Sequence, residues 1–202
     1  ACQRPGSGGC SAEPERKRMA AQRDELEMAP DAAEAWPDRI YDLLKEHDIR
    51  QVALVPDAGH SRLIRRCLAD NGMRVVTLTT EEEGVAQLFG AWLGGQKGVL
   101  LMQSSGVGNC VNMLSVAVAH RTPLPMLVTM RGEFGEFNPF QVPMGQATPA
   151  VLEAMGTLVR RADRPEDVAP TVDATLRLAF NTFRPTAALI GQRVIGAKTF
   201  GK

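Results

Sequence analysis

Three consecutive glutamates, Glu81, Glu82 and Glu83, are the residues whose spacing first suggests chemistry in this chain. A helix that begins here places Glu81 on the same face as Val85 and Leu88, because residues four and seven positions apart share a face. Glu82 and Glu83 then lie roughly 100° and 200° further round, where they can face solvent. One carboxylate is therefore directed at apolar surroundings, which disfavour its charged form and suit it to proton transfer.

The start of this helix is predicted independently by capping signals. Thr80, followed three residues later by Glu83, has the spacing of a capping box, and strand-like residues 74–78 come just before it. The alternative interpretation is that all three glutamates only complement the positive end of the helix dipole. Periodicity alone leaves both interpretations open.

Composition narrows the class of protein. The chain has 202 residues, and its 23 Lys and Arg balance 23 Asp and Glu, so charge predicts neither a nucleic-acid nor a membrane partner. Cys2, Cys10, Cys67 and Cys110 have the spacing of neither a metal site nor a disulfide framework. Without an apolar run of membrane-spanning length or a secretory signal, we expect a soluble cytoplasmic protein.

The chain divides into a tail and one folded domain. Residues 1–33 are rich in Gly, Pro and charge, so we expect a disordered tail followed by a domain over 34–202. Short, nearly continuous apolar strands alternate with helices in this domain, which predicts a doubly wound parallel α/β sheet of about six strands with helices on both faces. The predicted strands are 51–55, 74–78, 98–102, 126–130, 157–159 and 186–190, and the helices are 36–47, 61–70, one from Glu81, 109–120, 149–155 and 166–183.

Polar and glycine-rich residues follow several of these strands. Such sheets bind ligands at the carboxyl ends of their strands. Asp57 and His60 follow the first strand, Arg131 follows the fourth, and 103–109 follows the third. We expect 103–109 to form a loop able to hold an anion at the start of a helix, although it is neither a dinucleotide fingerprint nor a Walker motif. The equally weighted alternative is that polar residues such as Asp57 only cap helices.

Four blocks carry a resemblance to a known family. They are V-P-D, T-T-E-E-E-G-V-A with G-A-W-L-G-G-Q-K, L-M-Q-S-S-G-V-G-N, and P-M-L-V-T-M-R-G-E-F-G-E. From about Trp36 to the C-terminus the chain resembles the pyrimidine-binding domain of thiamine-diphosphate-dependent 2-oxoacid decarboxylases. Within this family it resembles the alpha subunit of sulfopyruvate decarboxylase and the matching half of phosphonopyruvate decarboxylase.

The resemblance implies roles for individual residues. The cofactor-activating glutamate of the family corresponds to Glu81, which would share a proton with the aminopyrimidine N1′. His60 is a candidate proton shuttle, although a histidine at a helix start is more often structural or solvated. Arg131 could bind a substrate anion, with an ion pair to Glu133 or Glu136 as the equally weighted alternative. Other implied cofactor contacts are Pro56, Ser105, Gly106, Gly108 and Asn109; other implied substrate contacts are Asp57, Gln103 and Asn109.

The resemblance also implies a partner. The family holds the cofactor diphosphate and its Mg²⁺ through a G-D-G motif, which does not occur in these residues. We therefore expect no metal ligands here and a complementary diphosphate-binding (beta-type) subunit, in a hetero-oligomer with at least two copies of each chain. The expected substrate is a small acidic 2-oxoacid. The alternatives are a carboligase or lyase subunit with the same cofactor, and a non-catalytic relative that keeps the fold.

Overall fold

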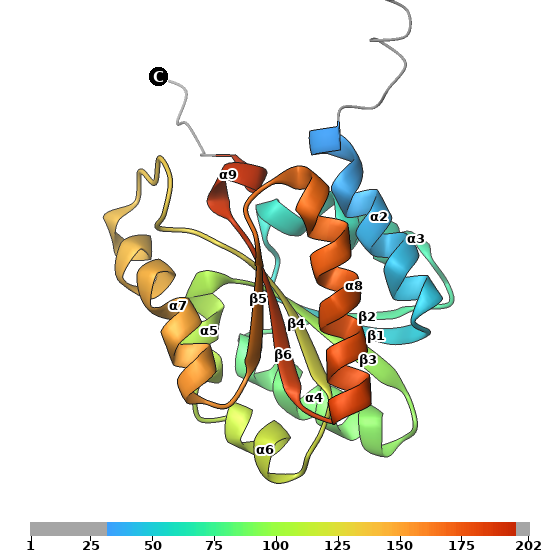
Figure 1. The fold of residues 1–202 in the computed structure, drawn as a ribbon. Helices are drawn as coiled ribbons and strands as arrows, with labels where there is room; N and C mark the ends of the chain where they lie inside the picture. Colours follow the sequence, from blue (N-terminus) through green and yellow to red (C-terminus); the bar gives the residue numbers. More distant parts are fainter. Residues whose placement is uncertain (1–31, 197–202) are drawn as a thin grey trace, which may run out of the picture.

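The computed structural model describes residues 32–196 and contains one six-stranded sheet in which all neighbouring strands are parallel (Figure 1). The strand order is β2-β1-β3-β4-β6-β5. The predicted doubly wound α/β fold is confirmed. The strands are β1 Ile49–Leu54, β2 Arg74–Thr77, β3 Lys97–Gln103, β4 Leu124–Thr129, β5 Leu158–Ala162 and β6 Pro185–Ile190.

Helices cover both faces of this sheet (Figure 1). On one face pack α2 Ala32–Glu46, α3 Ser61–Ala69 and α8 Pro165–Thr182; on the other pack α4 Glu81–Leu93, α5 Ser104–Cys110, α6 Leu114–Ala119 and α7 Val142–Ala154; α9 Gln192–Ile195 follows β6. Among residues 32–196 no helix combines the length and apolarity that crossing a membrane would need.

The core consists of two layers, one on each side of the sheet. Neighbouring strand residues alternate between them, because successive side chains point to opposite faces. Val52 and Leu101 join the layer under α2 and α8, whereas Ala53 and Leu100 join the layer under α4 to α7. The side chains of both layers are fully buried at the central strands.

The prediction of a loop over residues 103–109 is wrong. Residues 104–110 form α5, and the predicted helix 109–120 is in fact α6, which starts only at Leu114. Gly106 and Gly108 suggested a loop, but both serve close packing within a helix. A Cβ at Gly106 would overlap Glu81, and one at Gly108 would stand 3.2 Å from Sδ of Met144.

Three further details differ from the prediction. α7 begins at Val142 and not near 149, since Pro143 occupies its first turn and Pro149 lies within the helix. Leu68, an apolar residue of the predicted helix 61–70, is 61% exposed. At α4 the Thr80 side chain makes no cap bond, and Glu83 accepts instead from the backbone N–H of Thr79. Most of the predicted tail 1–33 lies outside the described residues, as do Cys2, Cys10 and residues 197–202.

Candidate active site

The candidate site lies where the winding of the sheet reverses, between β1 and β3. The chain leaves β1 toward β2 on one side, and leaves β3 toward β4 on the other. Ligand clefts of open α/β sheets form at the carboxyl ends of strands at such a point. Asp57 follows β1, α5 follows β3, and Glu81 begins the helix that returns to β3.

Glu81 is the buried member of the three glutamates. It is 7% exposed, whereas Glu82 and Glu83 are exposed on the surface of α4. Val85 and Leu88, one and two turns further along, are buried on the same side. The predicted orientation of the three carboxylates is therefore confirmed, and α4 directs one of them inward.

The carboxylate of Glu81 lies directly against α5. Asn109 donates through Nδ2 to Oε2 of Glu81 at 2.8 Å, and a Cβ built on Gly106 would stand 2.3 Å from Oε1. Cys110 lies nearby; burial first, and then the negative charge of Glu81, raise the pKa of its thiol to about 12. The carboxylate therefore has an amide donor on one oxygen, a glycine backbone beside the other and a neutral thiol as neighbour.

A second polar group joins the ends of three strands around Asp57. Gln103 donates through Nε2 to Oδ1 of Asp57 at 3.2 Å, and Thr129 donates through Oγ1 to Oδ2 at 2.5 Å. Ser105 donates in turn to Oε1 of Gln103 at 2.9 Å. The predicted residues Asp57, Gln103 and Ser105 therefore lie together. Thr129 was missed, and its place as the last residue of a buried strand was the available signal.

Arg131 makes the ion pair that was the alternative to substrate binding. Its Nε and Nη2 donate to the two carboxylate oxygens of Glu136, both at 2.7 Å. The side chains are 12% and 3% exposed. Glu136 also accepts from the backbone of Gly132 and from Gln192, and these donors, Arg131 first, hold its pKa far below the usual range. Glu133 pairs with Arg161 instead.

A small cavity connects the groups around Asp57 with Arg131. It has a volume of about 230 Å³ and is lined by Asp57, Thr129 and Arg131, with Gly59 and Ile195 among its other walls. Drug-sized ligands usually occupy roughly 300–1,000 Å³, so this cavity suits a smaller molecule. One carboxylate and one guanidinium face a space of the size of a small organic acid.

His60 is buried completely, which favours the structural alternative over a proton shuttle. Its Nε2 donates to the carbonyl of Leu127 at 3.0 Å, and burial lowers the pKa of the imidazole. A neutral ring bonded to the sheet backbone has no exposed edge to offer a substrate. Of the other predicted residues, Pro56, Gly108 and Asn109 are exposed, and Gly106 is buried.

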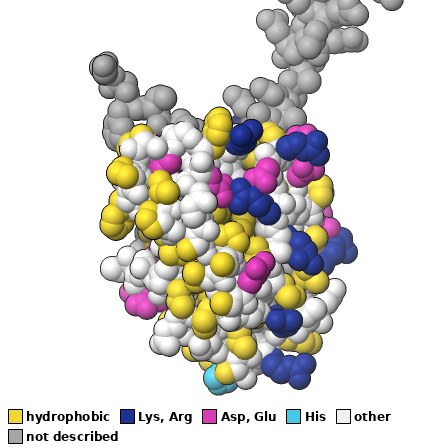
Figure 2. Space-filling model, turned by 60° about the vertical axis from the view of Figure 1, so that its left-hand side comes forward, with side chains coloured by type: hydrophobic (Ala, Val, Ile, Leu, Met, Phe, Trp, Pro, Cys, Tyr) yellow, Lys and Arg dark blue, Asp and Glu magenta, His cyan; other side chains and the backbone are white. Residues whose placement is uncertain are grey.

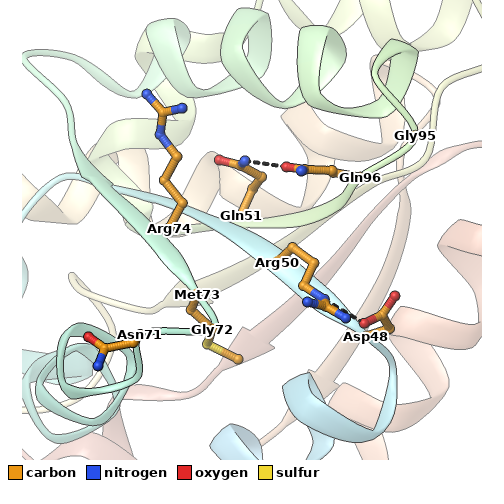
Figure 3. A pocket seen from close by; sticks show the side chains of 9 residues that line it. All are labelled: Asp48, Arg50, Gln51, Asn71, Gly72, Met73, Arg74, Gly95 and Gln96. Atoms are coloured by element: carbon orange, nitrogen blue, oxygen red, sulfur yellow. Dashed lines mark hydrogen bonds and ion pairs between the residues drawn. The ribbon is translucent and has the colours of Figure 1, made fainter.

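A larger cavity lies at the opposite edge of the sheet and contains none of the predicted residues. It has a volume of about 530 Å³ and opens at the amino ends of β1, β2 and β3 (Figure 3). Arg50 pairs there with Asp48, and Gln51 bonds to Gln96 (Figure 3). These polar groups bond to one another rather than converge on a centre.

Comparison with known proteins identifies the family of this chain. Residues 37–135 match the family model described as "Thiamine pyrophosphate enzyme, N-terminal TPP binding domain". The sulfopyruvate decarboxylase subunit alpha of Methanothermobacter thermautotrophicus is 32% identical over 164 residues, which cover 81% of this chain and 97% of that protein. The phosphonopyruvate decarboxylase of Streptomyces viridochromogenes is 34% identical over 142 residues, 69% of this chain and 34% of that longer protein.

The fold recurs in a solved structure, that of 2-oxoglutarate:ferredoxin oxidoreductase from Magnetococcus marinus. The two structures match with a TM-score of 0.60 and 17% sequence identity, over 79% of this chain and 29% of the oxidoreductase chain. The family model and the matching relatives define the class, an N-terminal-type domain of thiamine pyrophosphate enzymes. Within that class, the chain belongs to the family of sulfopyruvate decarboxylase alpha subunits.

Proposed function

We propose that this chain is the alpha-type subunit of a thiamine-diphosphate-dependent decarboxylase that acts on a small acidic 2-oxoacid, similar to sulfopyruvate or phosphonopyruvate. One observation carries the proposal. Glu81 is a buried carboxylate at the start of α4, held by Asn109 and lying against the bare backbone of Gly106. Relatives that match this chain over nearly their whole length are named as alpha subunits of such an enzyme.

The residues around Glu81 fit the pyrimidine end of the cofactor. A carboxylate can share a proton with a ring nitrogen, the amide of Asn109 keeps that carboxylate in one orientation, and the exposed backbone at Gly108 allows close approach. The bound cofactor supplies the electron sink that allows the substrate carboxylate to leave as CO₂. The contribution of this chain is then to hold the ring and to keep one proton at N1′.

The surroundings of Glu81 suit this proton transfer. Val85 on the same face of α4 is buried, and the Cys110 thiol stays protonated and does not compete as a base. The Asn109 amide donates to one carboxylate oxygen and therefore leaves the other for the shared proton. A buried carboxylate with one oxygen fixed by an amide can hold a shared proton on its other oxygen.

We assign the substrate to the cavity between Asp57, Thr129 and Arg131. Glu136 holds one edge of the Arg131 guanidinium, through Nε and Nη2, so the Nη1 edge remains for a carboxylate, sulfonate or phosphonate. Gln103 and Thr129 fix the Asp57 carboxylate at the opposite wall. The reaction consumes one proton and converts the 2-oxoacid into an aldehyde and CO₂, without a change in redox state.

The rest of the cofactor is assigned to a partner. Among the described residues no cluster of His, Cys, Asp and Glu has the arrangement of a metal site. We assign the diphosphate and its Mg²⁺ to a complementary chain, in a cytoplasmic assembly with at least two copies of each subunit. The naming of its close relatives as subunits supports this assignment.

The experiment is co-expression of this chain with the G-D-G-containing chain from the same organism. The purified complex is assayed for CO₂ release from sulfopyruvate, phosphonopyruvate and pyruvate in the presence of thiamine diphosphate and Mg²⁺. We expect release from at least one of the acidic substrates. A stable complex that releases CO₂ from none of the three would refute the proposal.

A further inference from the structure

Gln192 and Arg131 follow neighbouring strands of the sheet. The backbone N–H of Met130 donates to the carbonyl of Ile190 at 2.8 Å, which extends the pairing of β4 with β6 beyond the end of β4. Arg131 is the next residue after Met130, and Gln192 is the second residue after Ile190. Figure 1 shows α9 at the edge of the sheet where these strands end. The strand pairing therefore brings Gln192 to loop 131–138.

The side chain of Gln192 is buried and bonds to this loop. It is 2% exposed. Its Oε1 accepts from the backbone N–H groups of Glu133 at 2.8 Å and Phe134 at 2.9 Å, and its Nε2 donates to Oε2 of Glu136 at 2.9 Å. A glutamine amide has one donor end and one acceptor end. Gln192 therefore holds the loop backbone with one end and the Glu136 carboxylate with the other.

Gln192 is a donor to Glu136 from outside the loop. Within residues 32–196, the carboxylate of Glu136 accepts from Arg131, Gly132, Asn138 and Gln192. The first three donors belong to the loop, whereas Gln192 belongs to α9. Gln192 therefore fixes the carboxylate, and with it the guanidinium of Arg131, relative to the sheet.

The backbone of the loop has anchors of its own. The backbone N–H of Arg131 donates to Oγ of Ser104 at 3.0 Å, and Nε2 of Gln146 donates to the carbonyl of Gly132 at 2.9 Å. Neither bond involves the carboxylate of Glu136. Loss of the bond from α9 to Glu136 should therefore leave the loop in place and change chiefly the direction of the guanidinium.

Arg131 keeps part of its guanidinium for a ligand, unlike Arg161 nearby. Arg161 uses all three of its guanidinium nitrogens on Glu133 and Asp163. Basic and acidic side chains likewise stand next to one another in the upper part of Figure 2, at the edge where the strands end. Within residues 32–196, the guanidinium of Arg131 bonds through Nε and Nη2, and Arg131 is the only basic residue that lines the substrate cavity.

The reaction indicates which substrate anion Arg131 should bind. An acidic 2-oxoacid such as sulfopyruvate carries a carboxylate, which leaves as CO₂, and a sulfonate, which stays. A cation on the leaving carboxylate would stabilise the reactant more than the transition state and would slow the reaction. A cation on the sulfonate binds both states equally and lowers KM.

We propose that Gln192 is a positioning residue that sets, through Glu136, the direction of Arg131 toward the sulfonate or phosphonate of the substrate. This inference rests on the proposed function, and it names the part of the site that selects acidic over neutral 2-oxoacids. Gln192 acts without touching the substrate, because its amide is bonded to loop 131–138. A planar guanidinium recognises an anion by direction as well as by charge, so its orientation decides whether the bond forms.

Gln192→Glu isolates the bond to Glu136. The new carboxylate can still accept from the backbone N–H groups of Glu133 and Phe134, but an oxygen replaces Nε2 and repels Glu136. Gln192→Met, of similar length and without a donor, replaces this variant if thermal unfolding shows that it does not fold. Gln146→Glu is the matched control, because it removes a glutamine donor to the same loop and leaves the Glu136 carboxylate untouched.

Each chain is purified with the G-D-G-containing subunit, and CO₂ release is measured with the acidic substrate and with pyruvate. In Gln192→Glu we expect KM for the acidic substrate to rise about 10-fold, with kcat changed by less than about twofold, because the lost bond is shared by reactant and transition state. KM for pyruvate, or its inhibition constant if it is not converted, should stay within about twofold, as should every constant of Gln146→Glu. Sulfoacetate has a sulfonate but no keto group to react, and its Kd, measured by calorimetry, should rise with KM.

The outcomes separate this inference from the proposed function. An unchanged KM in folded Gln192→Glu would overturn the inference, as would an equal rise in Gln146→Glu, which would show only that the loop had loosened. A parallel rise for pyruvate would assign Arg131 to the leaving carboxylate and would also overturn it. If the wild-type complex releases no CO₂, the proposed function fails and the Kd of sulfoacetate alone decides the inference. An absence of binding, or equal Kd values in the two variants, would then overturn it.

Discussion

The backbone of Gly106 lies so close to Glu81 that a Cβ at this position would stand 2.3 Å from the Oε1 atom of the carboxylate. Real Cβ atoms do not approach oxygen so closely, so any side chain at 106 must displace Glu81. The two residues come from different helices, α5 and α4, and their contact fixes the carboxylate relative to the sheet. Glycine is required here for close approach and not for an unusual backbone angle.

Gly106→Ala should therefore impair catalysis more than folding. The displaced end of Glu81 is a flexible side chain, so the fold can adjust, but the carboxylate loses its position. We expect CO₂ release by the assembled enzyme to fall by about 100-fold or more, because misplacement of a catalytic group by about 1 Å can cost that much. Gly90→Ala on α4 is the control, since a Cβ there meets no atom within 4 Å. It should keep full activity and raise the free energy of unfolding by about 0.5–1 kcal/mol.

Glu81→Gln should remove proton sharing and leave the fold intact. We expect turnover to fall by roughly 10²- to 10⁴-fold, the usual contribution of a positioned acid–base group. Glu82→Gln, on the exposed side of the same turn, should be silent. Glu83→Gln should be nearly silent as well, because the amide carbonyl can still accept from the backbone N–H of Thr79. Steady-state kinetics of the three variants tests the assignment of Glu81 as the acid–base group. A large loss of turnover in Glu82→Gln would contradict that assignment.

Arg131→Lys tests whether this residue binds the substrate anion. Lysine keeps the charge but not the two parallel bonds to Glu136, so we expect the free energy of unfolding to fall by about 1–2 kcal/mol. If Arg131 also binds substrate, KM for the acidic 2-oxoacid should rise several-fold. Arg161→Lys is the matched control, because it loses a similar pair with Glu133 outside the substrate cavity. Equal KM values in both variants would leave Arg131 with a structural role only.

The sequence predicted the sheet and the orientation of Glu81 because both follow from periodicity. Apolar runs marked the strands, and a four-residue spacing placed Glu81 with Val85 on the buried side of α4. The prediction from sequence failed where glycine and proline are present for packing and not to form a loop. Gly106 and Gly108 indicated a loop but lie in a helix. Glycine is needed at these positions because residues distant in the sequence pack against them. The pairing of Arg131 with Glu136 rather than Glu133 likewise depends on loop geometry that no local pattern encodes.

The burial of His60 predicts a pH dependence of stability. Burial lowers the pKa of the imidazole in the folded chain below its ordinary 6.5. Just below pH 6.5, His60 is therefore protonated in the unfolded chain but remains neutral in the folded chain. The contribution of His60 to stability is therefore intact above about pH 6.5 and is lost as the pH falls toward the folded pKa, by at most about 1.4 kcal/mol per pH unit.

Urea unfolding at several pH values between about 7.5 and 5 measures this slope. In His60→Gln, whose amide can still donate to the carbonyl of Leu127, the loss of stability on acidification should be smaller by the same amount. Parallel curves for wild type and His60→Gln would show that His60 takes up its proton equally in both states.

Cofactor binding should depend on the complementary subunit. This chain offers Glu81 and Asn109 to the pyrimidine, whereas we assign Arg131 to the substrate and the diphosphate to the complementary subunit. The free chain should fold, since both layers of its core are complete, but should bind thiamine diphosphate weakly. Calorimetric titration with and without the partner and Mg²⁺ measures the difference. We expect tight binding only when both are present, with Glu81→Gln weakening it further. Tight, Mg²⁺-dependent binding by the free chain would contradict the division of the cofactor between two subunits.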